Sequence, residues 1–282
     1  MRLRVLVPAI LCLVVLSAPG LGFTQKQLDD HVAALKPTVP AGFTIVVQDP
    51  WIVIGNDDPA QVQAFASGTV RWTTEKLKQD YFAKDPERII NIWLFKDDAS
   101  YRKYAKLLFN DEPTSPYGYY SEACDALIMN IGTGGGTLVH EMVHAFVNTN
   151  FPHCPTWFNE GFASLYEQSS ERNGHIVGLT NWRLKGLQDA IRKGPLSSFR
   201  DLAATTTDEF YNRDRGNNYA QARYLCYYLQ EKGLLVRFYR EFLDNAPKDP
   251  TGYNTLVRIL DEKDMPAFQK RWEEFVLKLT FP

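Results

Sequence analysis

Residues 137–146 constrain this chain more than any other stretch, because they contain the pattern His-Glu-x-x-His. On an α-helix, positions i and i+4 lie one turn apart on the same face, so the imidazoles of His140 and His144 can converge on one point. Glu141 lies about 100° further round the helix, where it leaves room for an ion and still reaches a water beside it. The pattern therefore predicts a helix that supplies two metal ligands and a general base.

A catalytic zinc ion needs a third protein ligand and one open position. Glu160 is the best candidate, because a turn signal at residues 150–155 separates it from the two histidines. We expect Thr156 to cap a new helix that returns antiparallel and brings Glu160 beside them. The alternative is a first-turn carboxylate favoured by the helix dipole, but the capping-box position after Thr156 is Asn159. The two histidines and Glu160 are the predicted ligands of one Zn²⁺ ion.

The composition narrows the class of protein. A chain of 282 residues, with 45% hydrophobic and 23% charged residues, can bury a substantial core. Its net charge of −2 gives no basic excess, so no nucleic-acid partner is expected. The glycine-rich residues 132–137 lack the Gly-Lys-Ser/Thr ending of a phosphate-binding loop. We interpret them as a flexible lead-in that lets the next helix pack tightly.

The first 22 residues are typical of a secretory signal peptide. A short basic start at residues 1–4 precedes an apolar run at 5–16 and small residues at 17–22, with cleavage expected after Gly20 or Gly22. The apolar run contains Pro8 and falls short of the ~20 residues that span a membrane. We therefore expect a secreted or periplasmic protein with no stable membrane span after cleavage.

Cleavage would leave three cysteines. Cys124 and Cys154 flank the active-site helix in sequence, and an oxidising compartment would allow them to form a disulfide. An odd count leaves at least one free thiol, so the bridge and three free thiols both remain open. Cys226 stands in an apolar helical stretch and is predicted to be a buried thiol.

Hydrophobic periodicity predicts the elements before the metal helix. Helices are expected at residues 23–36, 58–82 and 98–108, a hairpin at 43–47 and 51–54, and further strands at 88–95, 117–120 and 126–129. An edge strand just before the metal helix would give an extended peptide a partner by strand addition. An ordinary strand that closes the sheet fits that position equally well.

Beyond residue 171 the pattern is helical throughout. Helices are expected at residues 181–193, 218–231, 234–244, 251–260 and 266–279, with polar connectors at 205–208 and 212–218. The sequence thus predicts an α+β protein of two lobes. Residues 23–150 form an α/β lobe with a small mixed β-sheet and the active-site helix, and residues 151–282 form a mostly helical lobe with the third ligand.

The pair of motifs resembles a known family. His140-Glu141-x-x-His144 together with Asn159-Glu160-Gly161 is similar to the gluzincin metallopeptidases, whose third zinc ligand is the glutamate of an Asn-Glu-Gly segment. The resemblance implies a zincin-like two-lobe fold, zinc ligation by both histidines and Glu160, and catalysis by Glu141. It also implies a peptide or protein substrate.

A second resemblance concerns residues 219–229, which are similar to a gluzincin aminopeptidase segment. There a tyrosine opens a helix and its hydroxyl stabilises the oxyanion, which implies a catalytic role for Tyr219. Other candidates for such contacts are Tyr211, Arg213, Arg215 and His175. The Gly-x-Met-Glu-Asn signature of the aminopeptidases is absent, and the interval from the histidines to the glutamate is shorter. An endopeptidase is therefore expected rather than an exopeptidase.

The predicted function is a secreted zinc metallopeptidase that hydrolyses peptide bonds with Glu141 as general base. One alternative is a catalytically inactive binding protein with a zincin fold. The intact Glu141 argues against it, because a structural site has no use for a base aimed at an open position. A second alternative is an amidase that uses the same zinc chemistry but hydrolyses amide bonds of cell-wall peptides. The sequence carries no signal for an oligomeric state.

Overall fold

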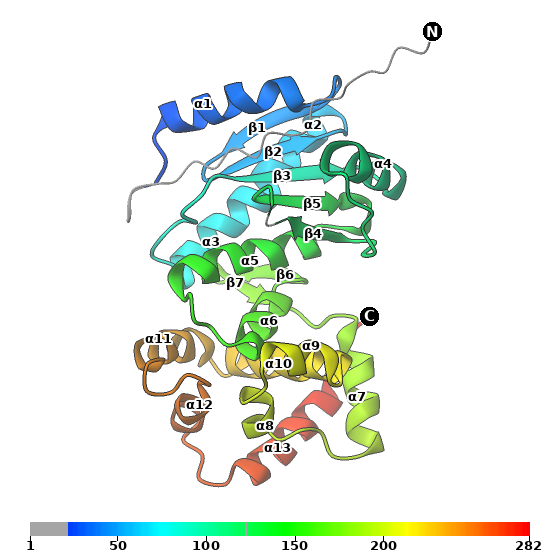
Figure 1. The fold of residues 1–282 in the computed structure, drawn as a ribbon. Helices are drawn as coiled ribbons and strands as arrows, with labels where there is room; N and C mark the ends of the chain where they lie inside the picture. Colours follow the sequence, from blue (N-terminus) through cyan, green and yellow to red (C-terminus); the bar gives the residue numbers. More distant parts are fainter. Residues whose placement is uncertain (1–21, 122) are drawn as a thin grey trace. The chain divides into compact units, whose positions relative to one another are not determined.

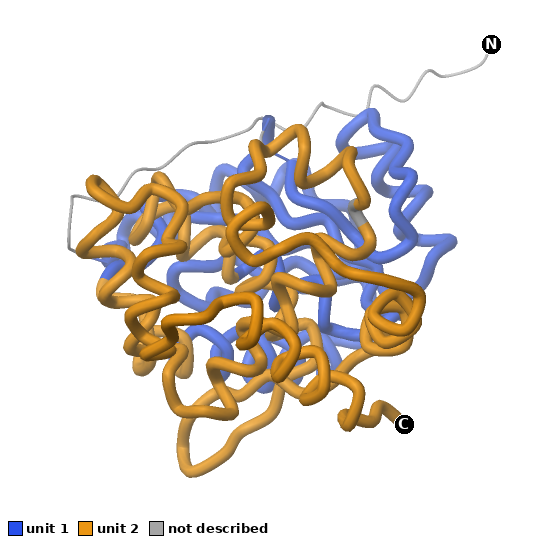
Figure 2. Tube along the Cα trace, turned by 90° about the horizontal axis from the view of Figure 1, so that it is seen from below, with its two compact units in different colours: residues 1–75, 84–142 blue, residues 76–83, 143–282 orange. Residues whose placement is uncertain are grey.

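The structure, a computed structural model, describes residues 22–121 and 123–282. It divides into two compact units, coloured blue and orange in Figure 2. The first unit comprises the described residues of Met1–Glu75 and Lys84–Met142, and the second comprises Lys76–Ala83 and Val143–Pro282. The predicted signal peptide lies outside the described residues, except for Gly22. Among the described residues, no helix is both long enough and apolar enough to cross a membrane.

The first unit is built on a mixed sheet of five strands in the order β1-β2-β3-β5-β4 (Figure 1). The strands are β1 (Thr44–Gln48), β2 (Trp51–Gly55), β3 (Ile90–Phe95), β4 (Gly118–Ser121) and β5 (Ala126–Asn130). β2, β3 and β5 run parallel, while β1 and β4 are antiparallel to their neighbours. Every residue of the three parallel strands is buried, as expected for continuous apolar runs. The α+β class, the small mixed sheet and the hairpin of β1 and β2 are confirmed.

One face of this sheet carries a hydrophobic core under two helices, α1 (Gln25–Leu35) and α4 (Asp98–Phe109). Alternate strand residues point to this face, because the side-chain period of a strand is two. The buried residues from these helices and strands are Leu28, Leu35, Ile52, Ile54, Trp93, Phe95, Tyr101, Leu108, Ala126 and Ile128. Both helices begin with a capping box, at Thr24 and Asp97.

The single helix predicted at residues 58–82 is three consecutive segments. They are α2 (Pro59–Phe65), a π-helical turn η2 (Ala66–Arg71) and α3 (Trp72–Asp80). Asp58 accepts the N–H of Ala60 at the start, as the cap signal predicts. The hydroxyl of Ser67, in the π-helical turn, donates to the carbonyl oxygen of Gln63 at 2.9 Å. Side-chain bonds of this kind compete with the regular backbone hydrogen bonds of a helix.

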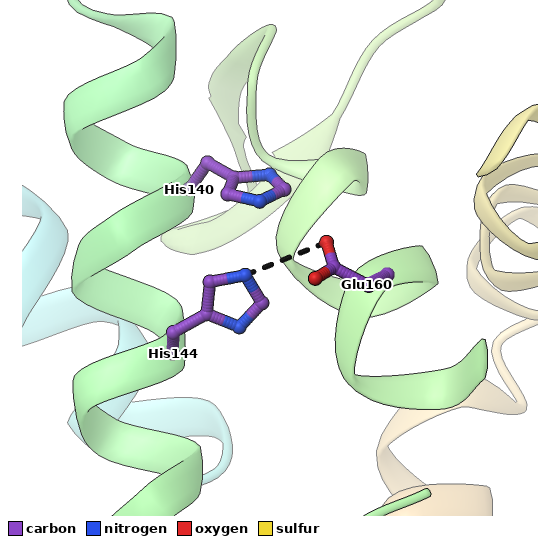
Figure 3. A group of neighbouring side chains, drawn as sticks. All are labelled: His140, His144 and Glu160. Carbon is purple, nitrogen blue, oxygen red and sulfur yellow. Dashed lines mark ion pairs between the residues drawn. The ribbon is translucent and has the colours of Figure 1, made fainter. Parts of the chain in front are cut away.

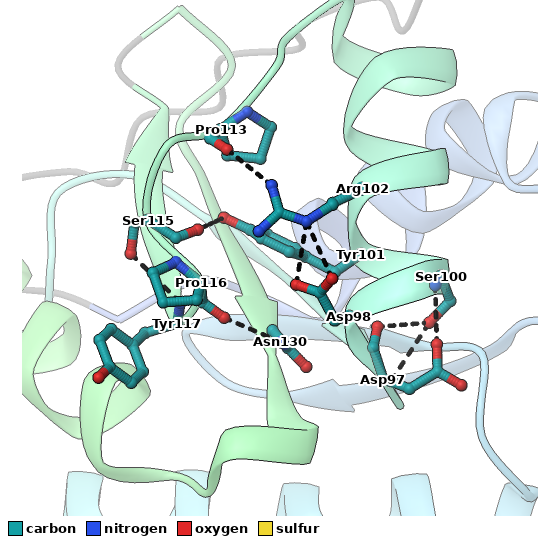
Figure 4. A network of polar contacts seen from close by, with 10 residues as sticks. All are labelled: Asp97, Asp98, Ser100, Tyr101, Arg102, Pro113, Ser115, Pro116, Tyr117 and Asn130. Carbon is teal, nitrogen blue, oxygen red and sulfur yellow. Dashed lines mark hydrogen bonds and ion pairs between the residues drawn. The ribbon is translucent and has the colours of Figure 1, made fainter.

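The loop before β4 is fixed by polar contacts (Figure 4). The guanidinium of Arg102 pairs with Asp98 and donates to the carbonyl oxygen of Pro113. The side-chain amide of Asn130 donates to the carbonyl oxygen of Pro116 at 2.8 Å. Burial raises the pKa of Tyr101 to about 12, so its hydroxyl remains a donor to the backbone of residue 115. The edge strand β4 therefore starts from an anchored backbone.

The second unit is mostly helical. Its helices include α6 (Thr156–Leu165), α7 (Arg183–Lys193), α8 (Phe199–Ala203), α9 (Thr207–Asn212), α10 (Arg215–Glu231), α11 (Leu235–Asn245), α12 (Tyr253–Leu260) and α13 (Met265–Lys278). The expectation of helix throughout is wrong at one place, where β6 (Ser169–Arg172) and β7 (His175–Gly178) form a hairpin. Asn173 and Gly174 connect these strands with φ values of 54° and 85°. Asn-Gly favours this turn, because both central residues need positive φ.

Two of the predicted connectors also contain helix. α9 takes the last two residues of the connector predicted at 205–208 and the first residue of the one predicted at 212–218, and α10 begins at Arg215 rather than Asn218. The capping box of Thr206 and Glu209 begins α9, and its threonine lies within the connector predicted at 205–208.

Residues 76–83 join the second unit through aromatic contacts. The ring of Tyr81 lies 4.9 Å from that of Phe162, and its hydroxyl accepts from Tyr166 at 2.8 Å. The ring of Phe82 stacks on Phe146 at 5.1 Å. This short segment is therefore part of the hydrophobic core around α6.

Candidate metal centre

Helix α5 (Gly136–Asn150) carries both histidines of the motif. Its apolar side chains, among them Met142, Val143 and Phe146, are fully buried and fix the rotation of the helix. The His140 side chain is nearly buried and that of His144 is 17% exposed, so both rings lie at the edge of the packed face. Glu141, between them in sequence, is half-buried. The predicted i, i+4 arrangement is therefore present on a regular helix.

Helix α6 brings the carboxylate of Glu160 to these rings (Figure 3). Glu160 Oε2 lies 3.5 Å from His144 Nε2, and candidate ligand atoms of all three residues lie within 4.8 Å of one another. A tetrahedral zinc ion, at about 2.1 Å from each ligand, holds its ligand atoms roughly 3.4 Å apart. The buried group of two imidazoles and one carboxylate could therefore hold a metal ion with little rearrangement. The predicted return of Glu160 beside the histidines is confirmed.

The predicted cap of α6 is wrong, although the helix is in the expected place. Pro155 is the N-cap residue and provides no side-chain hydrogen bond. Thr156 is the first helical residue, and its hydroxyl contacts that of Thr207 at 2.8 Å. Because proline has no side-chain acceptor, a capping box cannot form here, and Glu160 lies beyond the reach of any N-cap.

Close packing against α10 determines where α6 lies. A Cβ atom at Gly161 would lie 2.8 Å from the backbone carbonyl group of Ala222, so only glycine allows this approach. The buried Arg223 donates to the carbonyl oxygen of Ser164 at 2.9 Å and to those of Leu165 and Leu179. Burial lowers the pKa of its guanidinium, and the negative end of α6 favours the charge. The glycine after Glu160 is thus explained by packing.

Asn159 orients one of the histidines. Its Oδ1 lies 2.8 Å from His144 Nδ1. An amide oxygen can only accept, so with this amide orientation Nδ1 carries the proton. In the neutral ring the lone pair is then on Nε2, which faces Glu160 as a metal ligand would. The Asn-Glu pair therefore provides an orienting group and a candidate ligand from consecutive residues.

One tyrosine contacts Glu160, and a second lies beside that tyrosine. The hydroxyl of Tyr211, on α9, donates to Glu160 Oε1. Tyr219, on α10, is buried, and its ring lies 6.1 Å from that of Tyr211 and 5.0 Å from the guanidinium of Arg183. The sequence placed Tyr211 only among several secondary candidates. Nothing in residues 207–212 signals the contact, because its partner is 51 positions away in the chain.

The other secondary candidates lie elsewhere or have other partners. His175, on β7, is exposed, and its Nδ1 lies 2.6 Å from Asp80 Oδ1, so it links the hairpin to the end of α3. Arg213 is exposed and pairs with Glu209 at 3.6 Å. Arg215 is the first residue of α10. His175 and Arg213 are thus engaged in contacts with side chains outside the metal group.

The three cysteines in the described residues carry free thiols, so the disulfide considered between Cys124 and Cys154 is not formed. Cys124 packs beside the core of the first unit. The thiol of Cys154 contacts the carbonyl oxygen of Pro155 at 3.8 Å, and burial raises its pKa well above the usual value. Cys226 is fully buried, as predicted, and burial raises its pKa as well. Both of these thiols are therefore protonated and poorly reactive.

Comparison with known proteins gives no relative. No known protein family matches the chain, and no curated protein matches it. The candidate site is therefore defined by its own geometry.

Proposed function

We propose that this protein is a zinc metallopeptidase of the gluzincin type. The observation that carries the proposal is the convergence of His140, His144 and Glu160, with Glu141 on the same helix as the two histidines. Two imidazole nitrogens and one carboxylate oxygen are the donor set of catalytic zinc sites that keep one open position. The resemblance of the two sequence motifs to gluzincins supports the same assignment.

Zinc at such a site lowers the pKa of water and polarises a carbonyl group, which is the chemistry that the ion would supply. Glu141 would accept the proton of the attacking water and return it to the leaving amine. Its half-buried position suits this role, since a base must reach both solvent and substrate. Asn159 would keep His144 in the tautomer that binds a metal.

Tyr219 is the proposed donor to the negative charge that develops on the substrate carbonyl oxygen. The hydroxyl of Tyr211 is already engaged with Glu160, and Tyr219 is its aromatic neighbour. Loss of one such donor costs about a hundredfold in turnover or more. We therefore expect Tyr219→Phe to slow hydrolysis by about a hundredfold and to leave the metal in place.

The proposed substrate is an extended peptide. Among the described strands, β4 stands at the end of the sheet order and pairs with β5, so an extended peptide could add beside it as a further strand. Strand addition would bind peptides through their backbone, with little dependence on sequence. The anchored loop before β4 would keep this edge in one conformation. The secreted or periplasmic location implied by residues 1–22 remains part of the proposal.

The test uses the chain from residue 23 onward and its Glu141→Gln variant. Bound metal is measured by elemental mass spectrometry, and both proteins are offered a diverse peptide library. A matched control is Glu274→Gln, which makes the same change at an exposed position on α13. We expect zinc in all three proteins and cleavage by the wild type and the control alone.

Other outcomes separate the alternatives. Zinc without cleavage by any of the proteins would favour a binding protein that keeps the fold. Cleavage of cell-wall cross-link peptides but not of the library would favour an amidase. A well-folded wild type that binds no zinc would refute the metallopeptidase.

A further inference from the structure

The two carboxylate oxygens of Glu160 have different surroundings. Oε2 faces His144 Nε2 at 3.5 Å, which Figure 3 marks as a dashed line. Oε1 accepts a hydrogen bond from the hydroxyl of Tyr211. A carboxylate can bind a metal through one oxygen or through both, and the choice sets the number of positions left for water and substrate. The surroundings of Glu160 therefore bear on the coordination of the ion.

We infer that Tyr211 is a positioning residue that holds Glu160 Oε1 and so presents Oε2 alone to the metal. Hydrogen bonds to a ligating carboxylate fix its orientation and tune its charge, as outer partners do at many metal sites. With Oε1 engaged, Glu160 contributes one ligand atom, and the histidines contribute two more. The fourth position of a tetrahedral ion then stays open.

A second contact shows why Tyr211 reaches this oxygen. Thr156 and Thr207 are the first residues of α6 and α9, and their hydroxyls lie 2.8 Å apart. Glu160 and Tyr211 each follow these threonines by four residues, which is one helical turn on the same face. The two helices are therefore joined by two successive side-chain contacts, and the first contact sets the register of the second.

The far end of α9 is also held. The amide of Asn218 donates to the carbonyl oxygens of Phe210, at 3.0 Å, and Arg213. Phe210 is fully buried, with its ring 5.1 Å from that of Tyr219. Because the backbone on both sides of Tyr211 is fixed, its hydroxyl is preorganised before any metal binds. This inference rests on the metal centre of the proposed function but does not require peptide hydrolysis.

The experiment compares wild type, Tyr211→Phe and a control, Tyr227→Phe, which removes a hydroxyl from a tyrosine of α10 that packs against Tyr224 and Phe275. Zinc affinity is measured by competition with a chromophoric chelator. The absorption spectrum of each protein loaded with cobalt(II) reports coordination, since four-coordinate cobalt absorbs more strongly than five- or six-coordinate cobalt. Circular dichroism and thermal unfolding of the metal-free proteins check the fold.

We expect Tyr211→Phe to bind zinc about 10- to 100-fold more weakly and to give a weaker cobalt spectrum, as Glu160 becomes free to use both oxygens. The control should keep both wild-type values. Wild-type affinity and spectrum in Tyr211→Phe would overturn the inference. If this variant does not fold, Thr207→Val tests the same pair of contacts, and it should lower zinc affinity by a smaller factor.

The outcomes also separate this inference from the proposed function. A wild type that binds zinc but cleaves no peptide would refute the peptidase and leave the role of Tyr211 to be decided by the affinities. A wild type that binds neither zinc nor cobalt would refute both.

Discussion

Helices α5 and α6 both supply candidate metal ligands, but these side chains are positioned by different means. The histidines of α5 share one helix, so their spacing follows from helix geometry once that helix forms. Glu160 on α6 depends on tertiary contacts, with Gly161 against α10, Arg223 at the helix end and Tyr211 on α9. Two of the three side chains are thus positioned by helix geometry, and the third is positioned by packing between segments far apart in sequence.

Removal of a local ligand should have the largest effect. Zinc at a hundredfold excess over its dissociation constant stabilises a protein by about 2.7 kcal/mol. We expect this stabilisation in the wild type and its loss in His144→Ala, when each protein with zinc is compared with its own metal-free form. Thermal unfolding with and without zinc measures it. Equal stabilisation of both proteins would contradict the assigned ligands.

Disturbing the packing of α6 should have the second-largest effect on stability. In Gly161→Ala the added methyl group would meet the backbone at Ala222, and such overpacking costs about 1–3 kcal/mol. Urea denaturation of the metal-free protein gives the free energy of unfolding, and zinc affinity should fall as well. The control is Gly186→Ala on α7, where a Cβ meets nothing within 4 Å. That change should stabilise the protein by up to about 1 kcal/mol.

Loss of the Asn159 side-chain amide should have a comparable or smaller effect, and it should lower metal affinity without lowering the stability of the metal-free protein. Asn159→Ala removes the acceptor for His144 Nδ1, so we expect zinc affinity to fall about 10- to 100-fold. Asn159→Asp, which keeps an acceptor oxygen, should retain most of the affinity. Chelator competition measures both variants. If alanine and aspartate had the same effect, the hydrogen bond would not be the cause.

The smallest effect should come from a substitution on the exposed surface of α5. Asn148 is exposed on this helix, and asparagine is a weaker helix former than alanine. Asn148→Ala should raise the free energy of unfolding by roughly 0.5 kcal/mol and leave zinc affinity unchanged. A change in zinc affinity would mean that the spacing of the histidines is not set by the helix alone.

The same contrast explains what could be predicted from the sequence. The strands, the metal helix and its ligand pair follow from local periodicity, and Glu160 follows from the chemistry of a zinc site. The wrong predictions concern competing local signals. Thr156 has the chemistry of a cap, but Pro155 takes that place and the threonine contacts Thr207 instead. Asn173-Gly174 is a dipeptide that favours a hairpin turn, but the helical pattern assigned to the residues beyond 171 led to a prediction of helix there.

Tyr211 illustrates what local patterns do not contain. Its contact with Glu160 arises from the pairing of α6 with α9, and no periodicity within either segment encodes that pairing. The disulfide considered between Cys124 and Cys154 is a similar case. Flanking a helix in sequence does not bring two sulfur atoms within bonding distance.

The membership of Lys76–Ala83 in the second unit has a consequence for how the protein is made. This segment leaves the ribosome before β3 and the metal helix, yet its aromatic partners Phe146 and Phe162 are synthesised later. A nascent chain must therefore keep Tyr81 and Phe82 available until α6 emerges. A truncated product that starts after the metal helix would lack both rings, and the apolar surface left bare on its core would promote aggregation.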